Sequence, residues 1–227
     1  MSIKKISISN FRCFNGLDLE FSRFNNFIYG ANGSGKTSLL EALYFCSTGR
    51  SFKSSNKNLC IQNDKTAFKI QLDTLDNNKI CVLKETKKSI SLEINESKAT
   101  SIDLFRSIPS TLLDNKTFSM FAETPKYRRK ILDRCLMASD KNFNKDFFSF
   151  HRSLKQRNAA LKFKRLTNID MWSEIFINSG TLISEKRNNF FEETKQTFFM
   201  FAKNLNDKRV LEIINSLEIL FHKGWAS

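Results

Sequence analysis

Apolar and polar residues alternate through much of the first hundred positions. A period of two is typical of half-buried strands, because successive side chains point to opposite faces of a sheet. Three segments show this period: Ile6 and Ile8; Leu17, Leu19 and Phe21; and Phe68, Ile70 and Leu72. Two further apolar runs, residues 80–83 and 90–94, follow the turn-forming sequence DNN and a lysine pair. The pattern predicts an α/β lobe with several antiparallel strands, the later ones forming a meander.

From about residue 126 the apolar spacing changes to the period of helices. One stripe, with spacings of four, three, four and seven, consists of Phe143, Phe147, Phe150, Leu154 and Leu161. A second stripe consists of Trp172, Phe176, Ile183, Phe190, Thr194, Phe198, Phe201 and Leu205. The short polar sequence LTNID between them offers Asn168 and Asp170 as N-caps. We therefore expect an antiparallel pair of long helices in which most phenylalanines serve core packing.

Two prolines, Pro109 and Pro125, flank this change of period, with the polar sequence DNKTFSM between them. The predicted organisation is an N-terminal lobe, a linker, a helical arm and the start of a return to the first domain, at residues 1–108, 109–125, 126–206 and 207–227.

The sequence GANGSGKT fits the pattern G-x-x-x-x-G-K-[ST] of a phosphate-binding loop without a mismatch. Its glycines let backbone N–H groups converge on phosphate oxygens, Lys36 neutralises the β and γ phosphates, and Thr37 offers its hydroxyl to Mg²⁺. The context also fits, because the apolar FIY before the loop predicts a buried strand and SLLEALYFCST after it predicts a helix closed by Gly49. The motif predicts that ATP and Mg²⁺ bind at Gly30, Ala31, Asn32, Gly33, Ser34, Gly35, Lys36 and Thr37.

The charge of the chain favours nucleic acid or an anionic surface as a partner. Lys+Arg number 37 against 23 Asp+Glu, a net charge of +14. Residues 126–165 hold thirteen of the cations and only three carboxylates. The DNA-binding residues that we predict there are Arg128, Arg129, Arg152, Lys155, Arg157 and Lys162. Two alternatives stay open: an ordinary solvated helix face, and a structural role in which Arg128 and Arg129 pair with Asp133.

Other features narrow the class of protein. The N-terminal sequence lacks the apolar segment of a signal peptide, and no stretch is long enough to cross a bilayer, so we expect a cytoplasmic protein. The five cysteines form no C-x-x-C, and both histidines lie far from them, which argues against structural zinc and for free thiols.

Longer segments resemble the bacterial RecF family of DNA replication and repair proteins, relatives of the SMC-type and ABC-type ATPase heads. They are IKKISISNFRCFNGLDLEF, the phosphate loop, LLEALYFCSTGRSFKSS, ETPKYRRKILDR, HRSLKQRNAALK and MWSEIFINSGTLISEKRNNFF, in the order of that family. The resemblance implies a P-loop ATPase head that binds ATP and forms a homodimer around it. It also implies binding to single-stranded or gapped DNA, action with RecO and RecR to load the recombinase RecA, and a role in the SOS response.

Hydrolysis in that family needs further residues that follow the helical arm: an aspartate after an apolar strand, a neighbouring carboxylate and a glycine-containing signature loop. After Gly49 only Gly180 and Gly224 remain, and Asp114 and Asp133 are poor candidates for the aspartate. We therefore expect that the C-terminal half of the ATPase domain is absent, and that this chain binds ATP weakly with negligible hydrolysis.

Two interpretations from other functional classes stay open besides the resemblance to a RecF-like ATPase head. One is a free-standing small P-loop kinase or NTPase. The other is a non-enzymatic DNA- or partner-binding remnant with a vestigial nucleotide loop. Whether the chain is an enzyme is left open by its sequence.

Overall fold

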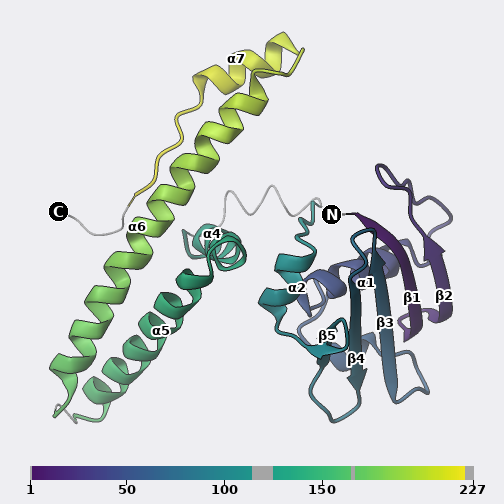
Figure 1. Cartoon of the computed structure of the whole chain (residues 1–227), viewed down its shortest axis with the longest axis horizontal. Coiled ribbons are helices and arrows are strands. Elements are labelled where there is room, and N and C mark those ends of the chain that lie inside the picture. The colour runs from purple at the N-terminus through teal and green to yellow at the C-terminus, as the bar shows by residue number, and fades with distance from the viewer. Residues whose placement is uncertain (1, 114–124, 165–166, 223–227) are drawn as a thin grey trace. The chain divides into compact units, whose positions relative to one another are not determined.

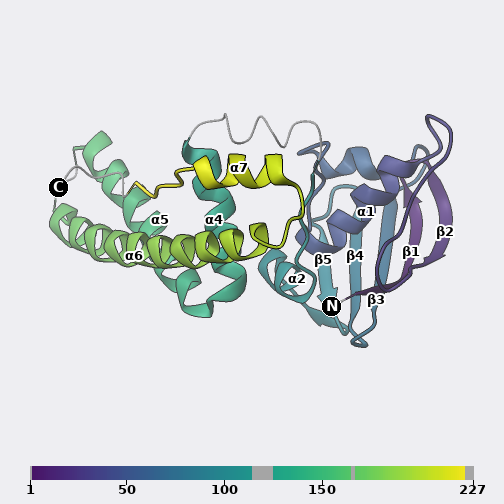
Figure 2. The same ribbon diagram turned by 90° about the horizontal axis from the view of Figure 1, so that it is seen from above.

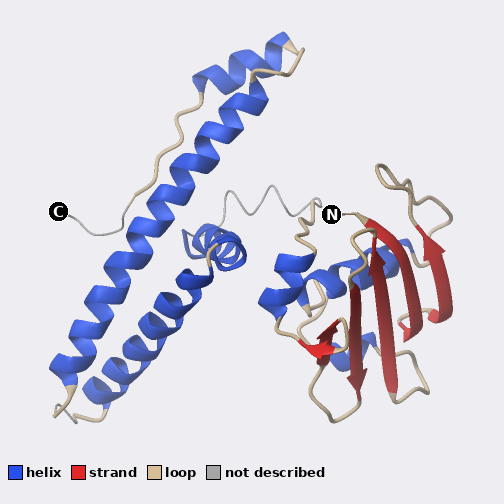
Figure 3. Ribbon diagram, viewed as in Figure 1, coloured by secondary structure: helices blue, strands red, loops and turns tan. Residues whose placement is uncertain are grey.

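The computed structural model describes residues 2–113, 125–164 and 167–222. The chain divides into two compact units, residues 1–118 and 119–227. The described strands all belong to the first unit, whereas the described part of the second is built from helices (Figure 3).

The first unit is organised around an antiparallel sheet of six strands, in the order β2-β1-β3-β4-β5-β6 (Figure 1). The strands are β1 (Ile3–Phe11), β2 (Phe14–Glu20), β3 (Ala67–Thr74), β4 (Lys79–Glu85), β5 (Ser91–Ile94) and β6 (Ser97–Lys98). Neighbouring strands from β3 to β6 are also consecutive in sequence, so the predicted meander is confirmed. In the register, Ile6 lies opposite Leu72 and Ile8 opposite Ile70, which gathers the apolar residues on one face. A shift of the strand register by one residue would turn these apolar side chains to the opposite face of the sheet.

The apolar face of the sheet is covered by α1 (Lys36–Thr48), the helix predicted after the phosphate loop (Figure 2). Phe11, Phe45 and Phe68 form a triangle of edge-to-face rings with centroids 5.0 to 5.8 Å apart. All three are buried, so the ring cluster joins the helix to two strands. The 3₁₀ helix η1 (Lys57–Cys60) and α2 (Ser101–Ser107) complete the described elements of this unit.

The prediction of a buried strand before the phosphate loop is wrong. Residues 25–30 form no strand, and Phe27, Ile28 and Tyr29 are 88%, 38% and 93% exposed. A strand satisfies its backbone only by pairing with neighbours, and no strand of the described residues pairs with this segment. The apolar run alone was therefore not enough to make a buried strand.

The described residues of the second unit contain the predicted antiparallel pair of long helices and two further helices. Its elements are α4 (Pro125–Ser139), α5 (Lys141–Lys162), α6 (Ile169–Ala202) and α7 (Lys208–Ser216). Phe143 and Ile183 are buried together, and Phe150 stacks on Phe176 with centroids 4.9 Å apart, which confirms the antiparallel pairing of α5 and α6 (Figure 1). Asn168 occupies the N-cap of α6, as expected, but its side chain makes no capping bond.

Ion pairs fix the three longest helices of this unit to one another. Arg187 of α6 donates from Nε and Nη2 to the carboxylate of Asp133 in α4, at 2.6 and 2.8 Å. Lys186 bridges Asp140 and Asp146 at 3.0 Å each. The bidentate geometry and the half-buried setting make the first of these pairs the stronger cross-link.

The second apolar stripe is less buried than its period predicts. Phe198, Phe201 and Leu205, at its C-terminal end, are 40%, 64% and 46% exposed. The expectation of core packing therefore fails for this end of the stripe. No helix among residues 2–113, 125–164 and 167–222 has the length and apolar character required to span a membrane.

Candidate functional site

The phosphate loop joins the exposed segment 25–29 to the start of α1, and its backbone is set by glycines. Gly33 and Gly35 have φ angles of 83° and 96°, in the left-handed region that other residues rarely adopt. Gly35 has a second reason to lack a side chain. A Cβ there would lie 2.7 Å from the ring of Phe14 and 2.9 Å from Sγ of Cys13, so the turn between β1 and β2 supports the loop from below.

The Lys36 side chain folds back over the loop. Its ammonium group donates to the carbonyl oxygens of Gly30 and Ala31, at 2.8 Å each. These bonds tie the Lys36 ammonium group to the first two residues of the loop. The first helical bond runs from Leu39 N–H to Gly35 O, so the amides of residues 36–38, in the first turn of α1, have no acceptor within the helix. Within the loop itself, Ser34 N–H donates to the carbonyl oxygen of Ala31 at 3.3 Å. Thr37 is exposed beside them.

A buried ion pair beneath this loop was missed by sequence reasoning. Arg12 donates from Nε and Nη2 to Glu41 of α1, at 2.9 and 2.7 Å, and from Nη1 to the carbonyl of Leu59 at 2.8 Å. Glu41 is fully buried and also accepts a short bond from the Ser51 hydroxyl, with the Cys60 thiol 3.7 Å away. A carboxylate in the middle of the apolar run LLEAL was the available signal, since such a charge needs a partner.

The electrostatics of Glu41 follow from these contacts. Burial raises the pKa of its carboxyl group, but the hydrogen bonds from Arg12 and Ser51 and the nearby positive charges outweigh burial and lower it below the ordinary value of 4.5. The same contact raises the pKa of Arg12. Glu41 is therefore ionised at neutral pH, and its charge holds the β1–β2 turn, α1 and η1 together.

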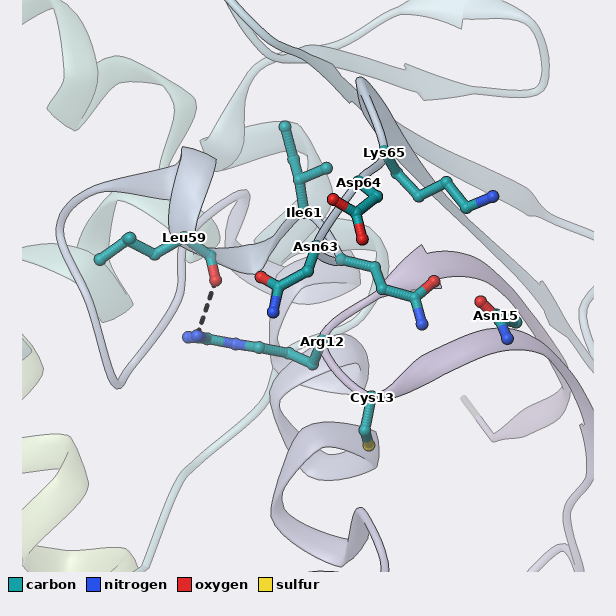
Figure 4. A pocket seen from close by; sticks show the side chains of 9 residues that line it. Arg12, Cys13, Asn15, Leu59, Ile61, Asn63, Asp64 and Lys65 are labelled. Carbon is teal, nitrogen blue, oxygen red and sulfur yellow. Dashed lines mark hydrogen bonds between the residues drawn. The ribbon is translucent and has the colours of Figure 1, made fainter.

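An open hollow lies beside the phosphate loop, at the same β1–β2 turn (Figure 4). Its volume is about 750 Å³, and it is lined by Arg12, Cys13, Asn15, Leu59, Ile61, Gln62, Asn63, Asp64 and Lys65. The lining is mainly polar. Cys13 lines the hollow and also approaches Gly35, so this residue is common to the hollow and to the surroundings of the loop.

The six predicted DNA-binding residues are distributed over two helices. Arg128 and Arg129 are exposed on α4, and the α5 residues Arg152, Lys155 and Lys162 are exposed as well. Arg157 differs from these five. It is half-buried, donates from Nε to the Ser173 hydroxyl at 3.1 Å, and lies 5.9 Å from the ring of Phe176. Its contacts cross-link α5 to α6, and its predicted part in DNA binding stays a prediction.

One of the two candidate aspartates, Asp133, lies among the described residues and takes part in an ion pair between helices. The carboxylate of Asp133 is held by Arg187. The suggested pairing of Arg128 and Arg129 with Asp133 stays a prediction. Asp114 lies outside the described residues. Among those residues, no group of three or more His, Cys, Asp or Glu side chains could hold a metal ion.

The fold and the loop together define a class, the P-loop nucleotide-binding lobe with a helical arm. The chain belongs to the family described as AAA domain, whose model matches residues 5–221.

Among curated proteins, the chain is similar to two called DNA replication and repair protein RecF. It is 34% identical to that of Pseudoalteromonas translucida (strain TAC 125) over 234 residues, covering 99% of this chain and 62% of the relative. It is 31% identical to that of Shewanella piezotolerans (strain WP3 / JCM 13877), covering 100% and 63%. The chain thus spans a little over three fifths of the length of these relatives.

Two solved structures are also similar, described as the recombination mediator protein RecF-ATPrS and RecF-ATP in the RecFOR pathway. Their TM-scores are 0.79 and 0.78, each at 27% identity, covering 90% of this chain and 58% of the other. The predicted resemblance to the RecF family, and the predicted α/β P-loop fold with its helical arm, are confirmed.

Glycine substitutions separate backbone strain from contact in the loop. Gly33→Ala, with open space around it, is expected to destabilise the first unit by about 1 kcal/mol through left-handed strain alone. Gly35→Ala adds overlap with Phe14, for a total of about 3 kcal/mol. Urea unfolding measures both, with Gly16→Ala as a near-neutral control because nothing lies within 4 Å of its added Cβ. Equal losses at positions 33 and 35 would contradict the described support by the β1–β2 turn.

Glu41→Gln removes the charge that holds Arg12. We expect a loss of about 3 kcal/mol in the free energy of unfolding at pH 7, as for other broken buried pairs. Because the folded-state pKa of Glu41 is lowered, its contribution is present above the ordinary value of 4.5 and is lost as pH falls through the lower folded-state value. The wild type and the variant should therefore converge in acid. Glu20→Gln, at an exposed position of β2, is the control, and a gap that stays constant with pH would refute the assignment.

Proposed function

We propose that this chain binds ATP with Mg²⁺ at Gly30–Thr37. The observation that carries the proposal is the loop geometry: left-handed glycines, amides at the start of α1 without a helical acceptor, and a Lys36 ammonium group held by two carbonyl groups of the loop. Such a loop is a ready site for phosphate oxygens, because the helix dipole and the N–H groups both favour negative charge. The two similar structures named with ATP or ATPrS support this choice of nucleotide.

Two side chains of the loop, Lys36 and Thr37, have separate parts in this proposal. The ammonium group of Lys36 exchanges its two carbonyl partners for phosphate oxygens, which are stronger acceptors. The hydroxyl of Thr37 is the group suited to Mg²⁺, which neutralises phosphate charge when bound. The hollow beside the loop takes the nucleoside, since Cys13 lines it and also approaches the loop, and since it carries the polar side chains of Asn15 and Asn63.

We further propose that the chain acts on DNA in replication and recombinational repair. The support is the similarity to proteins named for that process, and the exposed cations of α4 and α5. Phosphate contacts from such cations give affinity without reading bases. Single-stranded or gapped DNA, ATP-dependent homodimerisation, RecO and RecR as partners, RecA loading, the SOS response and a cytoplasmic location belong to the same proposal, which rests on the family resemblance.

Hydrolysis of ATP is not part of what we propose for this chain alone. The expectation of weak binding with negligible turnover stays a prediction. The alternative of a DNA- or partner-binding remnant with a vestigial loop is tested by the same experiment.

Lys36→Ala tests the nucleotide site. We expect ATP affinity, measured by calorimetry with Mg²⁺ present, to fall by at least about tenfold, because one charge-assisted contact to phosphate is lost. Lys36→Arg keeps the charge and should lose less. A wild-type chain that binds no ATP at millimolar concentration would favour the vestigial loop, and multiple turnover abolished by Lys36→Ala would refute the prediction of negligible hydrolysis.

Charge neutralisation on α5 tests the DNA contact. The triple change Arg152→Gln, Lys155→Gln and Lys162→Gln should weaken DNA binding and reduce the slope of log affinity against log salt by about 2 to 3, at about 0.9 per duplex phosphate contact. Arg157 is left intact because its contacts cross-link α5 to α6. The matched control neutralises the exposed residues Lys203, Lys208 and Arg209 in the same unit. Equal effects of the two triples, or wild-type affinity that is flat with salt, would count against binding by α5.

A further inference from the structure

The sequence contains two Asn-Gly steps, and one of them lies inside the phosphate loop. They are Asn15–Gly16 in β2 and Asn32–Gly33 in the loop. An asparagine before glycine is prone to lose its side-chain amide, because glycine has no Cβ to hinder attack by its backbone nitrogen on the asparagine side chain. The fold gives the two steps different backbone surroundings.

Asn32 and Gly33 are the central residues of a β-turn. The turn is closed by the bond from Ser34 N–H to the carbonyl oxygen of Ala31, at 3.3 Å. The φ angle of Gly33, 83°, is typical of the third residue of a type II turn, which differs from a type I turn mainly in the orientation of the central peptide. Among the residues that the structure describes, no hydrogen bond holds this peptide or the Asn32 side chain. The Gly33 nitrogen can therefore rotate toward the Asn32 side chain without breaking a hydrogen bond.

The reacting groups of this step are open to water. Asn32 and Gly33 are both exposed, and no atom lies within 4 Å of the position that a Cβ of Gly33 would take. Water and hydroxide thus reach the backbone nitrogen and the side chain, and there is room for a ring that joins the two residues.

The step in β2 has the same room but a fixed backbone. Nothing lies within 4 Å of an added Cβ at Gly16 either, and Asn15 is exposed. Gly16, however, lies opposite Ser9 in the register of β1 and β2, and Leu17 follows in the same ladder. Pairing keeps this backbone extended, with the Gly16 nitrogen rotated away from the Asn15 side chain, so β2 must open before the step can react.

We propose that Asn32 is a modification site at which spontaneous deamidation switches off the phosphate loop. The Gly33 nitrogen gives its proton to hydroxide and attacks Cγ of Asn32. The Cγ–Nδ2 bond breaks, and ammonia leaves with a proton taken from water, which restores the hydroxide. Water then opens the cyclic imide at either of its carbonyl carbons and yields aspartate or isoaspartate. The net reaction consumes water and needs no cofactor.

The product places a carboxylate beside the group that we propose binds phosphate. The Lys36 ammonium group is bonded at 2.8 Å to the carbonyl oxygen of Ala31, the residue before Asn32. A negative charge on the next side chain attracts this ammonium group and repels the phosphates of ATP. Isoaspartate also lengthens the loop, because a side-chain carbon enters the backbone. The conversion itself needs no ligand, whereas its effect on ATP rests on the proposed function.

The first experiment ages the whole chain in mildly alkaline buffer, with and without MgATP. Tryptic peptides 13–23 and 24–36 separate Asn15 from Asn32, so fragmentation mass spectra measure both conversions in one sample. In the folded chain we expect Asn32 to convert at least about tenfold faster than Asn15, because β2 must open first. MgATP should slow Asn32, since phosphate oxygens bind the loop amides. In urea the two rates should become similar. Equal rates in the folded chain, or faster conversion of Asn15, would overturn the proposal.

The second experiment measures the effect of the product on ATP affinity by calorimetry with Mg²⁺ present. We expect Asn32→Asp to bind at least about tenfold more weakly than Asn32→Gln, which keeps an amide, because the carboxylate repels phosphate. Asn77→Asp adds the same charge at an exposed turn between β3 and β4 and should leave affinity unchanged. If Asn32→Asp does not fold, the aged wild-type chain replaces it, and its loss of ATP binding should follow the conversion of Asn32. Equal affinities of the Asp and Gln variants would overturn the switch.

The two experiments separate this inference from the proposed function. A freshly prepared chain that binds no ATP removes the proposed nucleotide site and the switch with it, while the comparison of rates still decides whether Asn32 is the modification site. A fresh chain that binds ATP, and keeps its affinity as Asn32 converts, removes only the present inference.

Discussion

The buried carboxylate of Glu41 is the contact on which most of the first unit's functional surface depends. It accepts hydrogen bonds from the guanidinium group of Arg12 and from the hydroxyl of Ser51, and the Cys60 thiol lies 3.7 Å away. These groups come from the β1–β2 turn, the segment after α1, and η1. A buried charge needs an opposite charge or hydrogen-bond donors close to it. Supplying these to Glu41 brings the β1–β2 turn, the segment after α1 and η1 together at one point on α1. The hollow that Arg12 lines and the segment that follows α1 both meet at that point.

The phosphate loop depends on the same turn in another way. Gly35 lies so close to Phe14 and Cys13 that no side chain fits, and Arg12, one residue before Cys13, is held by Glu41. Glycine at this position therefore satisfies two demands at once, a left-handed backbone and a close approach. The loop is shaped by the chain itself, with Lys36 held by carbonyl groups that phosphate oxygens can replace.

Charge is handled differently in the two units. In the arm, the carboxylates Asp133, Asp140 and Asp146 are all engaged by Arg187 and Lys186, so ion pairs fix the helices to one another. The exposed cations of α5, such as Arg152, are left facing solvent. In the first unit, the positive charge of Lys53 helps to lower the pKa of the buried Glu41 carboxyl group, which Arg12 and Ser51 hold by hydrogen bonds. Ion pairs in the arm thus hold its helices together, and the exposed cations of α5 are the groups that can bind anions.

The sequence by itself determined the strands, their meander, the phosphate loop, the helix that follows it and the antiparallel pair α5 and α6. Periodicity and loop motifs are local properties, and local properties can be read along a chain. Sequence reasoning failed where a feature needs distant partners. The run FIY has the composition of a buried strand but no described strand pairs with it, and the stripe ending at Leu205 is apolar but exposed.

Only the tertiary structure decided which charges meet. Arg12 and Glu41 lie 29 residues apart and Asp133 and Arg187 lie 54 apart, and no spacing rule joins them. The tertiary structure likewise places the contacts of Arg157 between α5 and α6. The physical reason is that burial and electrostatic pairing depend on three-dimensional neighbours, whereas helix and strand periods depend on neighbours in the chain.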